Sequence, residues 1–529
     1  MEYSEVAALI NEKKIDEAGA ALKELRILHP DDVNTHIVTA SYYEMTGDSN
    51  AEFEALSEGM RIDPVNYEIF YMLGLYYEKI NTNQAFLCME QALFYCEKQG
   101  TKEECELISL KLSEYEREAG FSLNKFSVLI LSYNDRDIMI KNINSFRENV
   151  PSSSYEFIVV DNNSDDGIVE WLKKQSDIIL IENDENAGFP EGCNIGVRRC
   201  DREKDLLIIN NDAVPAVNAV FWLRMGLYEG RNVGAVSAVS NNASTQNVEG
   251  FDIDGSSSFE ECMKAAADIC IPMKNPYEER FRFTGFAVLL KKEAYNNLLL
   301  EDGGIFDNGF SPAYFEDDDL GIRTAASGYR QYLCHNSFIY HKGGEGFDIK
   351  NEKKNASKQE RIQKNRQKFI DKWGFDIWGY EASYDEMIAL IEKERSLPLR
   401  FLEIDCGMGI NLSKIKYLYP YSYTAGIELS RTACAYGRFM GDIICGDPCA
   451  VTFPWIEESF DYIFAGDRLK NIENQMLFLK KLKTYLKPDG IIFFVNSLDG
   501  DINTQKDLLE KNGFRNVEVR DEFITAVKE

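Results

Sequence analysis

The middle of the chain is patterned as short apolar runs that each end in polar residues. Four such runs occupy residues 126–131, 155–160, 178–181 and 206–209. Each run is too short for a helix face, and its continuous apolar character is typical of a strand buried on both sides of a parallel sheet. Helical segments lie between the runs, which favours βαβ units. The polar residues after the strands therefore meet at one edge of the sheet, where ligands bind in open α/β folds.

The first part of the chain repeats with a different period. Pro30 and Pro64 stand 34 residues apart in similar segments, and the same offset joins the small residues Ala40 and Gly74. Each unit predicts two helices separated by a turn. The pattern resembles tetratricopeptide repeats, whose period is about 34 residues. We expect residues 1–120 to form an all-α helical repeat, which acts either as a surface that recruits partners or as a plain spacer.

Composition limits which ligands the protein can bind and where in the cell it is expected to reside. The formal net charge of −30 excludes binding of nucleic acid or anionic lipid by bulk electrostatics, so a phosphorylated ligand needs a local cation. The 12 Cys residues include no CxxC pair, which suits reduced thiols. No run approaches the roughly 18 apolar residues of a membrane helix, and the N-terminus lacks the pattern of a signal peptide. We therefore expect a cytoplasmic protein with no integral membrane segment.

Asp212 is the first candidate functional residue. It follows the apolar run at 206–209 through Asn210 and Asn211, and Pro215 then stops the strand. A hard carboxylate on a rigid strand end is well placed to hold a divalent cation. The alternative is an aspartate that merely opens a turn.

An acidic run at residues 316–319 is the second candidate. Adjacent acids repel one another, which raises at least one pKa unless a cation binds nearby. The residues after the run continue as an amphipathic helix, and acids suit a helix N-terminus. A solvated acidic string is the alternative.

Seven segments of the chain occur in the order found in family 2 glycosyltransferases. The match is closest to the rhamnosyltransferase-like branch, and the segments are SVLILSYN, VVDNNSDDG, ENAGFPEGCNIGV, LLIINNDAVP, FTGFAVLLKK, FEDDDLGIR and YHKGGEGF. The resemblance implies that residues 125–348 form a GT-A domain of the α/β class. It also implies transfer of a hexosyl or deoxyhexosyl group from a nucleotide-diphosphate sugar.

The same resemblance implies roles for residues at the sheet edge. The residues expected near the nucleotide are Ser132, Tyr133, Asn134, Asp161, Asn186, Gly188 and Asn211. Asp212 and His341 match residues that hold Mn²⁺ or Mg²⁺ on the donor diphosphate. Asn210 stands where an acid is often found, so we expect the cation to be held weakly until the diphosphate arrives.

Asp317 matches the general base of the family. A carboxylate within reach of the acceptor hydroxyl can take its proton as that oxygen attacks the anomeric carbon, and a single displacement inverts the configuration there. Glu316 and Asp319 are expected to contact the acceptor or to start the helix, and Asp318 is expected to be solvated. The glycine pairs at 303–304 and 343–344 are expected to act as hinges for loops that close over the donor.

The last part of the chain resembles class I S-adenosylmethionine-dependent methyltransferases. We expect residues 349–397 to be a helical extension and linker, and residues 398–529 to form an α/β Rossmann-like methyltransferase fold. The resemblance implies that Glu428 holds ribose hydroxyls and that Asp447 meets the adenine of S-adenosylmethionine. Asp405 replaces the first glycine of the loop and would repel the ligand carboxylate. An active methyltransferase and a degenerate domain both remain open.

Taken together, the sequence predicts a multidomain bacterial enzyme that is an inverting, metal-dependent glycosyltransferase. The expected donor is a UDP-sugar. The favoured acceptor is a protein hydroxyl, on flagellin or another bacterial surface protein that the helical repeats recruit. One alternative is a cell-surface polysaccharide or lipid-linked glycan as acceptor, and another is a non-catalytic scaffold of degenerate enzyme domains.

Overall fold

The computed structural model describes residues 2–343, 352–380, 383–466, 472–495, 502–520 and 523–529. The chain divides into two compact units. The first contains Met1–Tyr277 and Arg282–Gln363, and the second contains Glu278–Phe281 and Lys364–Glu529. The predicted boundary between residues 348 and 349 lies outside the described residues.

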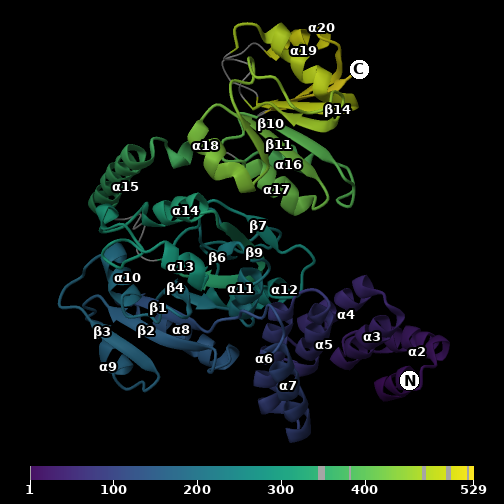
Figure 1. The fold of residues 1–529 in the computed structure, drawn as a ribbon, viewed down its shortest axis with the longest axis vertical. Helices are drawn as coiled ribbons and strands as arrows, with labels where there is room; N and C mark the ends of the chain where they lie inside the picture. The colour runs from purple at the N-terminus through teal and green to yellow at the C-terminus, as the bar shows by residue number, and fades with distance from the viewer. Residues whose placement is uncertain (1, 344–351, 381–382, 467–471, 496–501, 521–522) are drawn as a thin grey trace. The chain divides into compact units, whose positions relative to one another are not determined.

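The N-terminal part of the first unit is helical, as predicted (Figure 1). Its helices are α1 (Tyr3–Asn11), α2 (Ile15–Leu28), α3 (Val33–Thr46), α4 (Ser49–Ile62), α5 (Tyr67–Glu78), α6 (Thr82–Gln99) and α7 (Lys102–Tyr115). The repeated polar residues start helices, because the side chain of Asp32 caps α3 and that of Asn66, one period later, caps α5. The helical repeat is confirmed as an arrangement of helices, and its assignment to the tetratricopeptide class stays a prediction.

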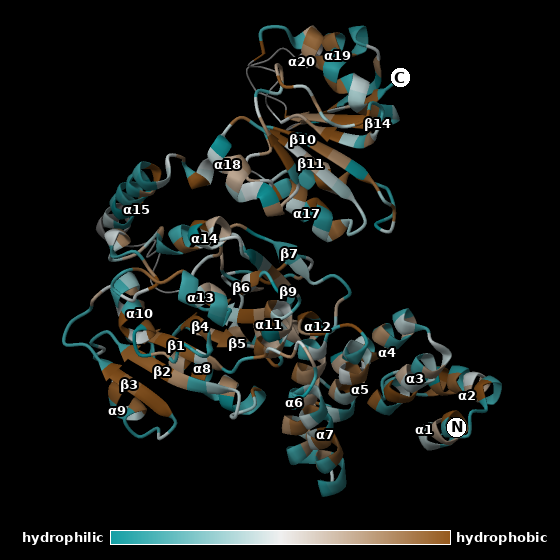
Figure 2. Cartoon of the chain, in the orientation of Figure 1, coloured by the Kyte–Doolittle hydropathy of each residue, from teal (hydrophilic) through white to brown (hydrophobic). Residues whose placement is uncertain are grey.

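A mixed sheet forms the centre of the first unit. Its strands lie in the order β3-β2-β1-β4-β8-β6-β9-β5. The four predicted runs are β1 (Phe126–Ser132), β2 (Tyr155–Asp161), β3 (Ile178–Glu182) and β4 (Asp205–Asn210), and these strands pair in parallel. Figure 2 shows β1, β2 and β3 as hydrophobic. Both faces of β1 and most of β2 are buried, whereas β3 is an edge strand whose side chains are half-buried or exposed, so the expectation of burial on both sides is wrong for β3. The later strands differ from the expected parallel sheet, since β8 pairs antiparallel with β4 and with β6.

The remaining elements of this unit complete the sheet and cover it. The strands are β5 (Ala213–Pro215), β6 (Val233–Val239), β7 (Tyr277–Glu279), β8 (Ala287–Leu290) and β9 (Arg330–His341). The helices are α8 (Arg136–Asn149), α9 (Ile168–Leu172), α10 (Phe189–Val197), α11 (Ala219–Leu227), α12 (Phe259–Ile269), α13 (Lys292–Asn297), η1 (Asn308–Phe310) and α14 (Glu316–Ala326).

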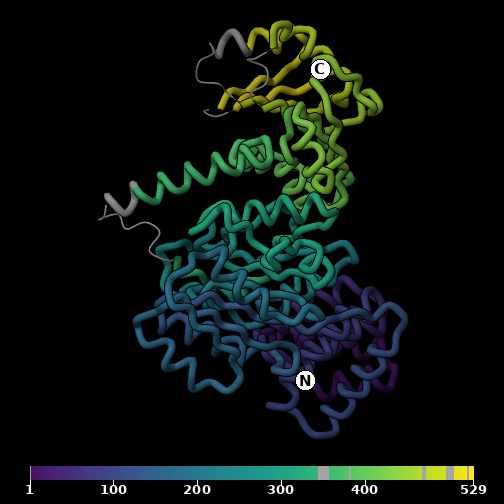
Figure 3. Tube along the Cα trace, turned by 60° about the vertical axis from the view of Figure 1, so that its left-hand side comes forward, coloured from purple at the N-terminus to yellow at the C-terminus, as the bar shows by residue number. Residues whose placement is uncertain are grey.

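The helical repeats pack directly on α11 and share the core of the sheet. Phe70 of α5 meets Phe221 edge to face, with ring centroids 5.1 Å apart. The hydroxyl of Tyr95 donates to Asn218 Oδ1 at 3.0 Å, and Asn218 Nδ2 donates to the carbonyl of Pro64 at 2.7 Å. One continuous cluster of buried side chains runs from the repeats into the sheet. Figure 1 shows α5 and α6 close to α11 and α12, and Figure 3 shows the purple helical repeats against the blue and teal part of the same unit.

The second unit contains a separate doubly wound sheet, as predicted for the C-terminal part. Its strands lie in the order β12-β11-β10-β13-β14-β16-β15. They are β10 (Arg400–Ile404), β11 (Tyr423–Glu428), β12 (Asp442–Cys445), β13 (Phe460–Phe464), β14 (Leu486–Val495), β15 (Phe514–Val519) and β16 (Phe523–Lys528). The helices are η2 (Ile377–Tyr380), α16 (Asp385–Ala389), α17 (Ile410–Leu418), α18 (Arg431–Tyr436), η3 (Gly437–Phe439), α19 (Gln475–Tyr485) and α20 (Ile502–Lys511), while α15 (Glu352–Trp373) joins the units in sequence. Within the described part of the chain, no helix has the length and apolar character needed to cross a membrane.

Candidate active site

Asp212 and His341 lie side by side at the edge of the first sheet. β5 pairs antiparallel with β9, and the register sets Ala213 opposite His341. Asp212 is therefore brought next to the end of β9, and its Oδ1 lies 3.5 Å from His341 Nε2. Both side chains are largely buried. The two residues predicted as metal ligands thus come together from distant parts of the sequence, and their role stays a prediction.

Hydrogen bonds fix the ring of His341. Its Nδ1 lies 2.7 Å from the carbonyl oxygen of Asn242, and because a carbonyl only accepts, Nδ1 carries the proton. The other nitrogen then presents a lone pair to the Asp212 carboxylate, so a proton or a cation must lie between the two groups. Burial lowers the pKa of His341, but the Asp212 carboxylate and the Asn242 carbonyl raise it by more. His341 therefore keeps a second proton to a higher pH than an ordinary histidine does.

A divalent cation fits the same pair. An octahedral ion with bonds of about 2.1 Å brings neighbouring ligand atoms to within about 3 Å of each other, close to the observed separation. The hydrogen bond from Nδ1 to a backbone carbonyl is the usual support of a ligating histidine. In the described ranges no group of three or more His, Cys, Asp or Glu side chains could hold a metal. Donor oxygens or water would therefore have to supply the remaining ligands.

Asp317 is connected to this edge by the segment that precedes β8. Its Oδ2 accepts a hydrogen bond of 3.0 Å from the backbone N–H of Gly285. The next residue, Phe286, stacks on the His341 ring at 5.1 Å and accepts a hydrogen bond from the N–H of Asn210. A Cβ at position 285 would lie 3.2 Å from Asp317 Cβ, so glycine allows this close approach. Sequence reasoning noted the motif that contains these two residues but assigned no role to either.

The other acids of the run are buried in the fold. Burial, with the charge of Asp317 adding to it, raises the pKa of Glu316 well above its ordinary value. Asp319 is fully buried and accepts a hydrogen bond of 2.8 Å from an arginine one turn later. The expectation that Asp318 is solvated is wrong, because Asp318 is 3% exposed and forms an ion pair with Arg282. Asp317, which is half-buried, is the most accessible acid of the run.

Three of the residues expected near the nucleotide form one network. Both carboxylate oxygens of Asp161 accept hydrogen bonds from Ser164, at 2.9 Å from its N–H and 2.6 Å from its hydroxyl. The N–H of Asn134 donates to the same hydroxyl, and Asn211 Nδ2 donates to the carbonyl of Asn134 at 2.8 Å. The ends of β1, β2 and β4 are thereby fastened together. Ser132, at the end of β1, is buried, and its hydroxyl has no hydrogen-bond partner within the described residues.

The other residues expected near the nucleotide are Tyr133, Asn186 and Gly188. Tyr133 is 51% exposed and lies next to the network. Asn186 Oδ1 accepts hydrogen bonds from Asn162 Nδ2 at 3.3 Å and from the N–H of Gly188 at 2.9 Å. Gly188 has φ of 80°, and a Cβ there would lie 3.0 Å from the backbone of Pro312. The glycine therefore allows close contact with the loop that leads to Asp317.

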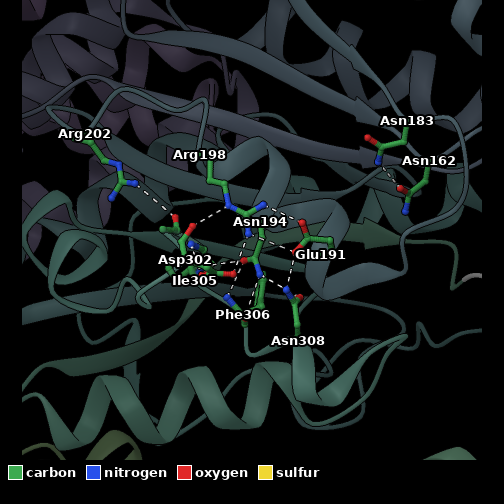
Figure 4. A network of polar contacts seen from close by, with 12 residues as sticks. Asn162, Asn183, Glu191, Asn194, Arg198, Arg202, Asp302, Ile305, Phe306 and Asn308 are labelled. Carbon is green, nitrogen blue, oxygen red and sulfur yellow. Dashed lines mark hydrogen bonds and ion pairs between the residues drawn. The ribbon is translucent and has the colours of Figure 1, made fainter.

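A second network, shown in Figure 4, holds that loop against α10. Asn194 Oδ1 accepts hydrogen bonds from the N–H groups of Ile305 and Phe306 at 2.8 and 2.9 Å. Its Nδ2 donates to the carbonyl of Phe306 at 2.8 Å, and Arg198 pairs with Asp302 at 2.9 Å. The predicted hinge glycine Gly303 lies inside this braced segment with φ of 78°. Gly344, of the other predicted pair, lies outside the described residues.

Lys342 supplies a positive charge at the same edge. It follows His341, its backbone N–H donates to the carbonyl of Asp212 at 3.1 Å, and its Nζ forms an ion pair with Asp135 just after β1. Its side chain is 48% exposed. Sequence reasoning required a local cation for an anionic ligand but did not name this lysine, although it adjoins the predicted His341.

The predicted ligand residues of the C-terminal domain lie at the carboxyl ends of their strands. Glu428 accepts hydrogen bonds from the N–H groups of Gly407 at 3.0 Å and Ser430 at 2.7 Å, so both of its oxygens are engaged. Asp447 is exposed and accepts a hydrogen bond of 2.9 Å from the N–H of Cys449. Asp405 directly follows β10 with φ of 54°. A left-handed residue directly after the strand is the conformation that glycine favours, which fits a position where the family has glycine.

Comparisons with known proteins agree with both resemblances. Residues 127–239 match the family model described as Glycosyl transferase family 2, and residues 402–494 match the model described as Methyltransferase domain. The chain therefore carries a family 2 glycosyltransferase domain followed by a methyltransferase domain. No curated protein matches the chain in a sequence search.

Several solved structures resemble parts of the chain. GalNAc-T7 with UDP, GalNAc and Mn²⁺ is 15% identical and matches 41% of this chain with a TM-score of 0.33; the match spans 43% of the length of GalNAc-T7. The mannosyltransferase PcManGT from Pyrobaculum calidifontis with GDP-Man and Mn²⁺ is 16% identical over 70% of this chain and 88% of its own, with a TM-score of 0.34. A SAM-dependent methyltransferase from Aquifex aeolicus is 16% identical over 27% of this chain and 88% of its own, with a TM-score of 0.23.

Proposed function

We propose that the protein is an inverting, metal-dependent glycosyltransferase that moves a hexosyl or deoxyhexosyl group from a nucleotide-diphosphate sugar to a hydroxyl acceptor. The supporting observation is that the Gly285-Phe286 segment connects Asp317 to the Asp212–His341 pair. A base and a cation-binding pair at one sheet edge are what this transfer requires. We propose a UDP-sugar as donor.

The chain's own residues carry the chemistry as follows. Asp212 and His341 would hold Mn²⁺ or Mg²⁺, which when bound would stabilise negative charge on the departing diphosphate. Lys342 lies beside them and attracts the anionic donor to a protein whose net charge is −30. Asp317 accepts the proton of the acceptor hydroxyl. Backbone N–H groups of Gly285 and Asp318 hold its two oxygens, so the carboxylate is oriented before the acceptor arrives.

For the acceptor we propose a protein, such as flagellin or another bacterial surface protein. The support comes from the repeats, where large apolar side chains remain exposed although α5 and α6 pack on the sheet; examples are Ile27 (79%), Leu107 (63%) and Ile80 (62%). A cell-surface polysaccharide or lipid-linked glycan is the rival acceptor. Mass spectrometry of candidate proteins co-expressed with the enzyme separates the two. A modified oligosaccharide together with unmodified peptides would exclude the protein acceptor.

The donor site is tested by calorimetric titration of UDP with and without Mn²⁺. We expect Mn²⁺ to increase the affinity of the full chain for UDP, and Asp212→Ala to abolish most of that increase because one of two protein ligands is lost. Glu301→Ala, an exposed acid far along the chain from the pair, is the control and should keep the increase. An unchanged metal dependence in Asp212→Ala would rule out its role.

A further inference from the structure

The C-terminal sheet has one place where a ligand is expected to bind. β10 has β11 on one side and β13 on the other, so the strand order reverses beside β10. In doubly wound sheets ligands bind outside the carboxyl ends of the strands at such a switch point. The loop at residues 405–409 leaves this point, and Glu428 stands at the end of the neighbouring strand. An S-adenosylmethionine molecule would have to lie here.

The side chain of Tyr380 already covers this loop. A Cβ built on Gly407 would lie 2.6 Å from Tyr380 Cδ1, so the phenol ring rests directly on the glycine backbone. The N–H of Gly407 is also used, because it donates to Glu428. Phe375 packs edge-on against Tyr380 with ring centroids 5.8 Å apart and supports it from behind. A ligand atom on this side of Gly407 would collide with the ring.

The hydroxyl of Tyr380 reaches the strand end where the ribose hydroxyls of the cofactor are expected. Ser430 and Glu428 both lie near the phenol. Burial, with the charge of Glu428 adding to it, raises the pKa of Tyr380, so the phenol stays neutral beside this acid. Each carboxylate oxygen of Glu428 accepts a hydrogen bond from a backbone N–H group, one from Gly407 and one from Ser430. The phenol thus lies near the acid that the resemblance assigns to the ribose hydroxyls.

A second tyrosine covers the other side of the switch point. A Cβ built on Gly466, just after β13, would lie 2.8 Å from the hydroxyl oxygen of Tyr384. The backbone N–H of Tyr384 donates to Asn411 Oδ1 at 2.8 Å, which anchors this residue to the first turn of α17. The ends of β10 and β13 are therefore both covered by aromatic side chains from the residues that precede the sheet.

We propose that the cofactor crevice of the C-terminal domain is closed from within by Tyr380, so that the chain binds S-adenosylmethionine only after this side chain leaves Gly407. The residues in the crevice do not fit the cofactor that the fold implies while Tyr380 is in place. The inference is independent of the proposed glycosyl transfer.

Calorimetric titration of the full chain with S-adenosylmethionine and with S-adenosylhomocysteine tests the proposal. We expect Tyr380→Ala to bind both at least ten-fold more tightly than the unsubstituted chain, because the variant no longer has to displace the ring. Tyr380→Phe keeps the ring and its contact with Phe375, so we expect its affinity to stay within about two-fold of that of the unsubstituted chain. Tyr421→Ala, an exposed tyrosine of the same domain (69%), should bind like the unsubstituted chain.

Two results would overturn the proposal. The first is equal affinity for S-adenosylmethionine in the unsubstituted chain and in both Tyr380 variants, since the ring would then not hinder binding. The second is absence of binding in all of them with the fold retained by circular dichroism, since another group, such as Asp405, would then be what excludes the cofactor. Tyr380→Leu, which removes the ring but keeps an apolar side chain, decides the question if Tyr380→Ala does not fold.

Discussion

The carboxylate of Asp317 is held by N–H groups from two segments, Gly285 before β8 and Asp318 in its own helix. Its neighbours in the run have other partners or are deeply buried. The resemblance alone assigned the base to Asp317, and the structure adds that Asp317 is the accessible acid and is joined to the His341 side of the edge through Phe286.

Asp317→Asn tests this assignment. The amide keeps the size of the side chain but cannot take a proton, so we expect kcat to fall by about 10²–10⁴-fold while the Kd for UDP with Mn²⁺ changes by less than about two-fold. Steady-state kinetics and calorimetry measure the two quantities. Glu301→Gln is the control. Retained turnover in Asp317→Asn would place the base elsewhere.

Glu403, in the middle of β10, makes the stability of the C-terminal unit depend on pH. Burial raises its pKa to about 8, with Asn411 lowering it and Glu428 raising it, whereas an unfolded chain would release the proton near 4.5. The folded state therefore holds a proton that the unfolded state loses. The stability linked to this group is fully present below pH 4.5 and falls as the pH rises to about 8.

Glu403→Gln should remove this dependence, because the amide never ionises. We expect the difference in unfolding free energy between pH 5 and pH 8 to shrink by up to about 4 kcal/mol, as measured by urea unfolding of the full chain. The exposed Glu457→Gln in the same unit is the control. Equal pH dependence in both variants would mean that Glu403 ionises freely.

At the scale of elements, α10 and the loop before α14 act as one piece because Asn194 satisfies three backbone groups of that loop. The loop leads into the acidic run, so its position sets where Asp317 lies. Gly304 permits the contact, since a Cβ there would lie 2.5 Å from Asn194 Cγ.

Asn194→Ala should destabilise the first unit by about 2–4 kcal/mol, because it leaves two buried N–H groups unpaired. Glu191→Gln weakens a half-exposed ion pair with Arg198 but keeps an amide oxygen that can accept from Asn308, so it should cost less than about 1 kcal/mol. Urea unfolding compares the two. Similar small losses in both variants would show that water can replace the Asn194 contacts.

The local pattern of apolar and polar residues predicts some elements of the fold and not others. The apolar runs predict β1, β2 and β4 because burial on both faces requires unbroken aliphatic residues, whereas the equally apolar β3 is a half-exposed edge strand. The pairing of β5 with β9 could not be predicted, because β5 has 3 residues and its partner lies far along the chain. The burial of Asp318 depends on Arg282, which lies 36 residues away in sequence. The ring of Tyr380 over Gly407 likewise depends on a tertiary contact that no spacing reveals.

At the scale of the whole molecule, the repeats and the glycosyltransferase domain share one core. Phe70 lies in α5 but its ring packs on Phe221 of α11, and both are at most 4% exposed. A substitution at this contact should therefore destabilise the entire first unit rather than the repeats alone.

Phe70→Ala should lower the unfolding free energy of the first unit by about 3–5 kcal/mol, through lost burial and the cavity that remains. Hydrogen exchange by mass spectrometry should show faster exchange both in α6 and in α11, with α17 of the second unit unchanged. The exposed Ile80→Ala (62%) is the control. Faster exchange confined to residues 1–116 would show that the repeats fold on their own.

The shared core also sets the order of events during synthesis. The face of α5 that carries Phe70 leaves the ribosome about 150 residues before Phe221, and at roughly 5–20 residues per second this delay lasts about 8–30 s. During that time Phe70 can already pack on Tyr95 of α6, but the face of the repeats that packs on α11 has no partner within the chain. The newly made protein must therefore pass through a stage in which this surface is exposed, when it is prone to aggregate and is a natural client for a chaperone at the ribosome exit.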